Sequence, residues 1–290
     1  MKIIVGKNAG FCYGVKRAVE GVEELVKKEN KKIYCFGEIV HNGDVINNLK
    51  EKGVEFIEDL SNSKGLTVIR AHGISKDNYE YLKNNQIKYI DYTCPNVLNI
   101  HKVAEEYSKN GYYIFLIGDS KHPENIGTIS FCGEKSLIIE REDDVKNAIE
   151  IYEKSNSNKL LIIAQTTYSL KSFNNILEKI KEMCNGKWQI VVKNTICNVT
   201  EVRQIETEEL SKKVDVMVII GGKNSSNTKK LYDIALKNCK KAILVENSHE
   251  LDLGDVKDEA VIGIMAGAST PQSSIEEVKM SINRELEVIN

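Results

Sequence analysis

The chain repeats one arrangement of segments three times, and this repetition restricts its fold more than any other feature. In each repeat a strand-like run ends in a glycine, a polar loop and an asparagine, and a helix-like segment follows. A second strand-like run then ends in a loop of small residues before another helix-like segment. The asparagines are Asn42, Asn125 and Asn227, and the small-residue loops surround His72, Thr166 and Ser269. Strands that alternate with helices predict parallel sheets with helical crossovers.

Three cysteines share one local context, in which a β-branched run leads to the thiol and a helix-like pattern follows. They are Cys12, Cys94 and Cys197, and they lie too far apart in sequence to form one local knuckle. Three α/β units that merely resemble one another would explain the recurring glycines and asparagines, because βα loops are generally rich in such residues. They would not explain a matching cysteine in each unit, so we interpret the three thiols as parts of one shared centre.

We therefore predict an α/β fold of three pseudo-repeated α/β domains. Their predicted boundaries are 13–95, 96–193 and 194–282. The N-terminal strand in 1–12 carries the first cysteine and, like the C-terminal tail, can cross over to a neighbouring repeat. In parallel sheets the loops at the carboxyl ends of the strands form the ligand crevice, and the candidate residues lie in those loops.

Charge and hydropathy exclude several classes of function. The net charge of -2 argues against a nucleic-acid binder that depends on a basic face, although a local basic pocket stays compatible with it. The N-terminal stretch MKIIVGKNAG is too short and too weakly apolar for a signal peptide, and the longest apolar runs are strand-sized. We expect a cytoplasmic protein that does not enter membranes. No coiled-coil heptads occur, and we expect a monomer.

The chain has seven cysteines, and in a protein without an export signal exposed thiols are better suited to metal binding or catalysis than to disulfides. We interpret Cys35, Cys132, Cys184 and Cys239 as ordinary small hydrophobic residues. The other three thiols could hold zinc together with a histidine, or three irons of a cubane cluster. Structural zinc normally uses closely spaced cysteine pairs, which are missing here. Three thiolates on a four-iron cluster would leave one iron open to a substrate.

The remaining polar loop residues fit a phosphate or diphosphate ligand. Three of the five histidines and several hydroxyl and amide side chains are predicted at helix N-termini, where anions bind well. No GxxxxGK[ST] loop is present, so a nucleoside triphosphate is not indicated. Glu124 stands two residues after His122; it is either a first-turn carboxylate stabilised by the helix dipole or a proton donor, and we favour the donor. His101 and His249 are predicted on the solvated surface.

These motifs together resemble the 4-hydroxy-3-methylbut-2-enyl diphosphate reductase family. The resemblance covers, in the family's order, the following stretches: GFCYGVKRAV, EIVHN, AHG, DYTCP, HPE, QTT, TICNVT, SSNT and AGASTP. It runs nearly end to end and implies three α/β domains around a pseudo-threefold axis with a central iron–sulfur cluster. The fold that it implies agrees with the repeats described above.

The resemblance also implies a role for each candidate residue. Cys12, Cys94 and Cys197 would hold one [4Fe–4S] cluster per chain, with one iron that lacks a protein ligand. Glu124 would deliver protons, and Thr166 would orient the substrate hydroxyl and a nearby water. The residues implied around the substrate, most of them at its diphosphate, are His41, His72, His122, Thr167, Ser225, Ser226, Asn227 and Ser269.

The implied reaction is the last step of the methylerythritol phosphate route to isoprenoids. It removes the allylic hydroxyl of the diphosphate substrate with two electrons and two protons, and it yields isopentenyl and dimethylallyl diphosphates. No flavin or nicotinamide motif is present, so we expect an external donor such as ferredoxin or flavodoxin.

Two other functions remain open at this point. A quinolinate-synthase-like dehydratase would also use three repeats around a three-cysteine cluster, but it would bind carboxylates instead of a diphosphate. A non-enzymatic iron–sulfur sensor would not need the organised pocket that the histidines and Glu124 predict.

Overall fold

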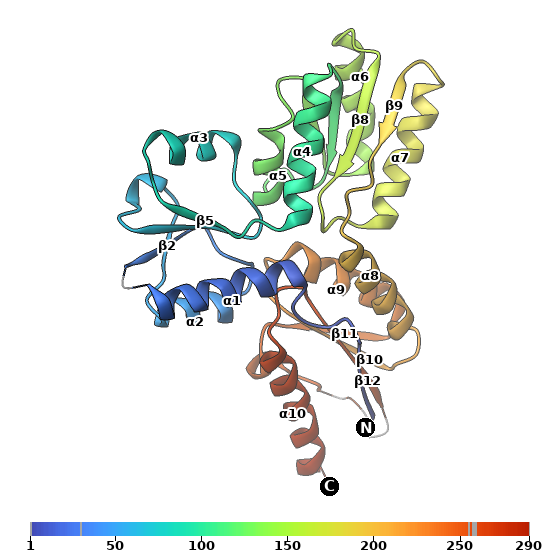
Figure 1. The fold of residues 1–290 in the computed structure, drawn as a ribbon. Coiled ribbons are helices and arrows are strands. Elements are labelled where there is room, and N and C mark those ends of the chain that lie inside the picture. The colour runs from blue at the N-terminus through green and yellow to red at the C-terminus, as the bar shows by residue number, and fades with distance from the viewer. Residues whose placement is uncertain (1, 30, 255, 257–259, 290) are drawn as a thin grey trace. The chain divides into compact units, whose positions relative to one another are not determined.

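The computed structural model describes residues 2–29, 31–254, 256 and 260–289 (Figure 1). The chain forms two compact units. The first unit comprises 1–19, 40–52 and 198–290, and the second comprises 20–39 and 53–197. The three contiguous domains predicted from the sequence stay a prediction, because the two units are each built from segments that are separate in sequence.

Within the described residues the strands form three parallel sheets of four strands each, and all three share one strand order. Sheet A, in the first unit, has the order β11 (Lys241–Val245), β10 (Val216–Ile220), β12 (Val261–Ala266) and β1 (Lys2–Val5). Sheet B, in the second unit, has the order β3 (Glu55–Ile57), β2 (Ile33–Phe36), β4 (Leu66–Ile69) and β5 (Tyr89–Asp91). Sheet C, also in the second unit, has the order β7 (Ser136–Ile139), β6 (Tyr113–Ile117), β8 (Lys159–Ala164) and β9 (Gln189–Val192).

The fourth strand of sheet A comes from the opposite end of the chain. β1 pairs in parallel with β12, and Lys2 lies opposite Val261 in this register. In sheets B and C the fourth strand instead follows the other three in sequence. The N-terminal segment therefore completes a sheet whose other strands belong to the last third of the chain.

In sheets A and C the central strands β10 and β6 are continuous apolar runs, and both faces of these sheets are covered. Every residue of β6 and of β10 is buried, as is typical of parallel sheets between helices. In sheet C the odd-numbered residues of β6 pack with α6 (Val145–Lys154) and α7 (Leu170–Cys184). The even-numbered residues pack with α4 (Pro95–Lys109) and α5 (Pro123–Ile129), which are the green helices beside β8 in Figure 1.

Sheet A is covered in the same way. Met217 and Ile219 of β10 face α8 (Asn198–Ser211) and α9 (Ser226–Asn238), and the alternate residues of β10 face α10 (Gln272–Ile289). Side chains that alternate between two faces follow from the two-residue period of a strand. The core of the first unit thus lies in two layers, one on each side of sheet A.

Sheet B packs against α3 (Lys76–Asn84) through Ile69 and Leu82. On α1 (Tyr13–Lys28) a side chain at Gly21 would project into the ring of Tyr92, so the helix approaches the chain after β5 closely. The helix α2 (Gly43–Glu51) belongs to the first unit, and Asn42 caps it by accepting a hydrogen bond from the Val45 N–H at 3.1 Å. Short 3₁₀ turns occur at Leu60–Asn62, Glu142–Asp144 and Ser248–Glu250.

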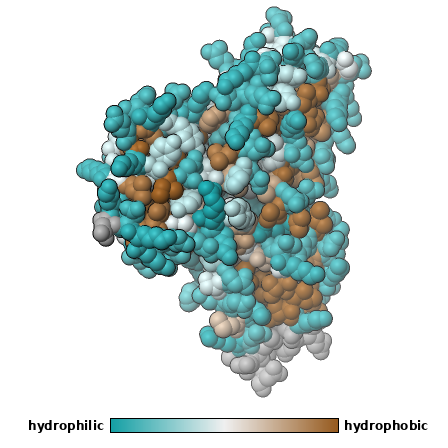
Figure 2. Space-filling model, in the orientation of Figure 1, coloured by the Kyte–Doolittle hydropathy of each residue, from teal (hydrophilic) through white to brown (hydrophobic). Residues whose placement is uncertain are grey.

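The predicted α/β fold with parallel sheets is confirmed. No helix in the described part of the chain is long and apolar enough to cross a bilayer. The face drawn in Figure 2 is mostly hydrophilic, and its hydrophobic residues lie in smaller patches between polar ones.

Candidate active site

The three predicted cysteines occupy equivalent places, each in the segment that follows the fourth strand of one sheet. In each case the cysteine N–H donates a hydrogen bond to a carbonyl two residues beyond the end of the third strand. The pairs are Cys94 to Ala71 at 2.9 Å, Cys197 to Thr166 at 2.9 Å and Cys12 to Ala268 at 3.1 Å. The same kind of loop-to-loop hydrogen bond therefore fixes the backbone of each of the three cysteines.

The seven thiols are all free, and their exposure divides them. Cys12, Cys94, Cys197 and Cys239 are partly exposed. Burial raises the pKa of Cys35 and of Cys132 to about 12, which makes them inert under physiological conditions. Cys184 is also buried, and the Cys239 thiol donates to the Val214 carbonyl at 3.4 Å. Burial therefore sets Cys35, Cys132 and Cys184 apart, and the contact to Val214 distinguishes Cys239 from the three candidate metal ligands.

A side-chain amide contacts one of the candidate metal ligands. Asn96 donates a hydrogen bond from Nδ2 to Sγ of Cys197 at 3.0 Å. Asn96 lies in the first turn of α4, two residues after Cys94, which occupies the N-cap position. The contact therefore brings the Cys197 loop to the end of α4 where Cys94 lies.

The loop before Cys12 is held by α8. The Glu206 carboxylate accepts the backbone N–H groups of Lys7 at 2.6 Å and Asn8 at 3.0 Å, and also the Asn8 side-chain amide at 2.8 Å. The buried Arg203 donates from Nη2 to the Gly10 carbonyl at 2.6 Å. Since α8 starts at the residue after Cys197, the helix that follows one candidate ligand positions the loop of another.

Glu124 is buried, with only 1% of its surface exposed, and both of its carboxylate oxygens are bound by Thr166. Oε1 accepts the Thr166 backbone N–H at 2.6 Å, and Oε2 accepts the Thr166 hydroxyl at 2.6 Å. Burial raises the pKa of Glu124 to about 7, and the two hydrogen bonds from Thr166 partly offset this rise. A carboxyl group with such a pKa can donate a proton at neutral pH.

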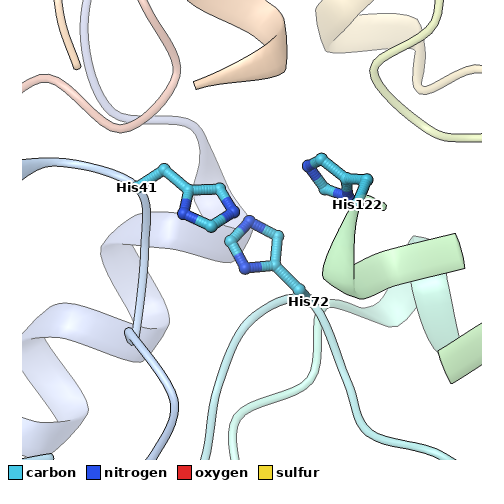
Figure 3. Close-up of side chains that lie close together, drawn as sticks. All are labelled: His41, His72 and His122. Carbon is cyan, nitrogen blue, oxygen red and sulfur yellow. The ribbon is translucent and has the colours of Figure 1, made fainter. Parts of the chain in front are cut away.

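Two of the predicted histidines lie together in the second unit. The rings of His72 and His122 meet edge to face, with centroids 5.3 Å apart and an interplanar angle of 89° (Figure 3). Nδ1 of His122 accepts the Glu124 backbone N–H at 3.2 Å, so a neutral His122 carries its proton on Nε2. Gly73, directly after His72, has a φ of 75° that favours glycine and lets the chain turn at this point.

Gln165 positions Thr167 and was not foreseen from the sequence. Its amide nitrogen donates to the Thr167 hydroxyl at 2.8 Å, and its amide oxygen accepts the Asn125 amide at 2.9 Å and the Asp119 N–H at 3.1 Å. This network joins the loop after β6 to the loop after β8 and so orders Thr167 beside the Glu124–Thr166 pair.

The other predicted ligand residues lie in the first unit. Ser269 donates from its hydroxyl to the His41 carbonyl at 3.1 Å, which links the loop after β12 to the segment before α2. Ser225 caps α9, where its hydroxyl accepts the Thr228 N–H at 3.3 Å, and Ser226 begins the helix. Asn227 is 3% exposed, and neither polar atom of its side chain has a hydrogen-bond partner within the described residues. This helix N-terminus can bind an anion.

The predicted site residues thus divide between the two units. The group in the second unit contains His72, Cys94, His122, Glu124, Thr166, Thr167 and Cys197. The group in the first unit contains Cys12, His41, Ser225, Ser226, Asn227 and Ser269. Figure 3 also draws His41.

One sequence prediction about the histidines is wrong. His101 is only 4% exposed, and its ring stacks on Phe131 with centroids 4.3 Å apart. Its Cε1 lies 3.0 Å from the position that a Cβ on Gly73 would take, so it packs beneath the His72 loop. Burial lowers the pKa of His101 to about 4. His249 is exposed, as predicted.

Comparison with known proteins points to one family. The family model described as "LytB protein" matches residues 3–283. A protein of Caldanaerobacter subterraneus subsp. tengcongensis, named 4-hydroxy-3-methylbut-2-enyl diphosphate reductase, is 44% identical over 96% of this chain and 95% of its own length. A protein of Helicobacter pylori strain P12 with the same name is 40% identical over 98% of this chain and 99% of its own length.

Solved structures of similar proteins carry related titles. One is titled as (E)-4-hydroxy-3-methyl-but-2-enyl diphosphate reductase, the terminal enzyme of the non-mevalonate pathway. It is 37% identical, covers 98% of this chain and 99% of its own, and superposes with a TM-score of 0.70. A second, the E-1-hydroxy-2-methyl-but-2-enyl-4-diphosphate reductase from Plasmodium falciparum, is 32% identical, covers 98% of this chain and 87% of its own, and has a TM-score of 0.86.

Proposed function

The chain belongs to the LytB protein family, and on this premise we propose that it is a 4-hydroxy-3-methylbut-2-enyl diphosphate reductase. The reaction removes the allylic hydroxyl of the substrate as water and forms isopentenyl and dimethylallyl diphosphates. The identities and coverages above favour this reductase over a quinolinate-synthase-like dehydratase, since the named relatives and solved structures match along nearly the whole chain.

We propose that Cys12, Cys94 and Cys197 hold one [4Fe–4S] cluster with one iron that lacks a protein ligand. The residues fit this group because the three thiols are free and partly exposed, and because one backbone hydrogen bond presents each of them in the same way. When bound, the cluster supplies electrons and a Lewis-acidic iron for the substrate hydroxyl.

The observation that carries the proposal is the buried Glu124–Thr166 pair. The Thr166 N–H can only donate, so Oε1 of Glu124 must accept and a proton on the carboxyl group sits on Oε2. The Thr166 hydroxyl, which can both donate and accept, lies 2.6 Å from Oε2. Glu124 therefore holds a proton that the Thr166 hydroxyl can relay to the leaving hydroxyl of the substrate.

Substrate binding is assigned to both groups of polar residues. His72, His122 and Thr167 are proposed ligands of the second unit, and Nε2–H of a neutral His122 can donate to a phosphate oxygen. In the first unit, His41, Ser225, Ser226, Asn227 and Ser269 are proposed ligands. The buried amide of Asn227 at the start of α9 supports this role, because a bound anion would satisfy its N–H groups.

We also propose that electrons arrive from an external ferredoxin or flavodoxin, and that the protein is a cytoplasmic monomer. A reductase without its own flavin or nicotinamide needs a separate electron donor.

Mössbauer spectroscopy tests the proposed function directly. Protein purified without oxygen and reconstituted with iron and sulfide is measured with and without 4-hydroxy-3-methylbut-2-enyl diphosphate. We expect a four-iron cluster in which the spectrum of a single iron site changes when the diphosphate is added. An unresponsive cluster would favour an iron–sulfur sensor, and zinc with no iron would contradict the proposal.

A further inference from the structure

Neither the start of α4 nor its packing in the core requires the hydrogen bond between Asn96 and Cys197. Asn96 is exposed in the first turn of α4, while its neighbours Val97 and Ile100 point into the core. Pro95 at the first helical position already starts the helix, since its fixed φ suits that position. The Asn96 side chain therefore has no role in core packing, and its amide nitrogen donates a hydrogen bond to Sγ of Cys197 at 3.0 Å.

The Cys197 loop is fixed by other contacts as well. The Thr195 hydroxyl accepts the Ala164 N–H at 2.8 Å, and the Asn194 side chain accepts the Ile196 N–H at 3.1 Å. The Cys197 N–H itself donates to Thr166. Loss of the Asn96 amide would therefore leave the loop in place and remove only the donor to sulfur.

We propose that Asn96 is a positioning residue that orients Sγ of Cys197 and raises the reduction potential of the bound cluster. This inference rests on the proposed function, because it requires that Cys197 is a cluster ligand. A donated N–H stabilises negative charge on a ligating sulfur, and hydrogen bonds to the sulfurs are among the factors that set iron–sulfur potentials. The reduced cluster carries one more negative charge than the oxidised cluster, so it gains more from the donor.

No proton leaves Asn96 in this role. The cluster accepts one electron from the external donor, and the amide keeps both hydrogens throughout. A higher potential makes that electron transfer more favourable, so Asn96 assists reduction without contacting the substrate.

The test is a redox titration of the reconstituted cluster, followed by electron paramagnetic resonance, in three variants. Asn96→Leu removes the donor at similar size, and Asn96→Asp replaces it with a carboxylate that suits a first helical turn but cannot donate when ionised. Asn99→Leu is the matched control, because Asn99 is an exposed asparagine one turn later on the same helix.

At the wild-type midpoint potential we expect the ratio of reduced to oxidised cluster to fall about threefold in Asn96→Leu. A threefold change in this ratio corresponds to roughly half of the shift in midpoint potential that a tenfold change would require. Asn96→Asp should lower the ratio further, because its charge opposes the charge on sulfur. Asn99→Leu should match the wild type. Both Asn96 variants should also lose iron to a chelator faster than the control.

The results separate the inference from the proposed function. A wild-type chain that assembles no reducible cluster overturns the proposed function and the inference with it. A normal wild-type cluster whose potential is unchanged in both Asn96 variants overturns the inference alone. An equal shift in Asn99→Leu also overturns it, because the effect would then come from the helix surface in general.

Discussion

At the scale of single residues, the proposed chemistry rests on Glu124. Its neighbour Thr166 donates to both carboxylate oxygens, and burial keeps the pKa of Glu124 at about 7. The sequence indicated Glu124 as a proton donor because it follows His122. The hydrogen bonds between Glu124 and Thr166 could not be predicted from sequence spacing. Thr166 lies in the loop after a different strand, and the contact depends on how β6 and β8 pair.

Replacement of Glu124 by glutamine should abolish most turnover. Glutamine preserves the size of the side chain but carries no transferable proton, so we expect kcat to fall by about 10²–10⁴-fold. Iron content and substrate binding should stay close to wild type. Activity is measured with excess chemical reductant, and Glu134→Gln, on an exposed glutamate, is the control. Wild-type turnover in Glu124→Gln would show that another group donates the proton.

Replacement of Cys197 by serine should give protein with little or no bound cluster. A serine hydroxyl is a poor ligand for iron in this class of cluster, where thiolates are the usual ligands. Cys239→Ser is the matched control, because that thiol is also partly exposed but donates to a backbone carbonyl and packs against a hydrophobic cluster. Iron and sulfide per chain are measured after anaerobic reconstitution, and full occupancy in Cys197→Ser would refute the three-thiolate assignment.

At the scale of elements, the sequence located strands and helices from their periodicity, and it placed the candidate residues at strand ends correctly. It failed for α4, where His101 was expected on the surface. A histidine on an amphipathic helix is typical of a polar surface, but the second turn of α4 lies under the His72 loop, and Phe131 packs against the His101 ring and covers it. Such burial depends on neighbours that are distant in sequence.

Glu206 of α8 accepts the backbone N–H groups of Lys7 and Asn8 in the loop before Cys12, and we call this set of hydrogen bonds the clamp. Glu206→Ala removes the acceptor of two backbone N–H groups and should destabilise the folded protein by about 1–2 kcal/mol. Because the loop carries Cys12, the variant should also lose its cluster faster. Glu208→Ala is the control, since that exposed glutamate pairs with Lys212, the residue after the end of α8. Thermal unfolding and iron release measure the two effects, and equal behaviour of both variants would contradict the clamp.

At the scale of the whole molecule, the alternation of strands and helices predicted parallel sheets, and the sheets have one strand order three times. What the pattern left open is which strand completes each sheet. β1 joins β12 at the other end of the chain because its apolar residues match that register, and a short strand alone does not reveal its partner. The roles of the site residues came from the resemblance and stay predictions.

Stability against pH offers a last test of the buried carboxyl group. The pKa of Glu124 is raised to about 7 from an ordinary value of 4.5, so between these values the folded state binds more protons than the unfolded state. Stability from this group therefore falls as pH rises from about 4.5 to about 7, and the full penalty persists above that range.

Glu124→Gln removes this penalty, so its melting temperature should exceed that of the wild type most clearly near pH 8, and the difference should shrink towards pH 4.5. The free-energy difference should be on the order of a few kcal/mol, at about 1.4 kcal/mol per pKa unit. His101 works in the opposite direction, because its pKa is lowered to about 4 and its contribution is lost as pH falls. In the wild type alone, the effects of Glu124 and His101 on the melting temperature would overlap. The difference in melting temperature between Glu124→Gln and the wild type at each pH reports the contribution of Glu124. A difference that does not change with pH would mean that Glu124 is ionised in the folded protein and cannot be the donor at neutral pH.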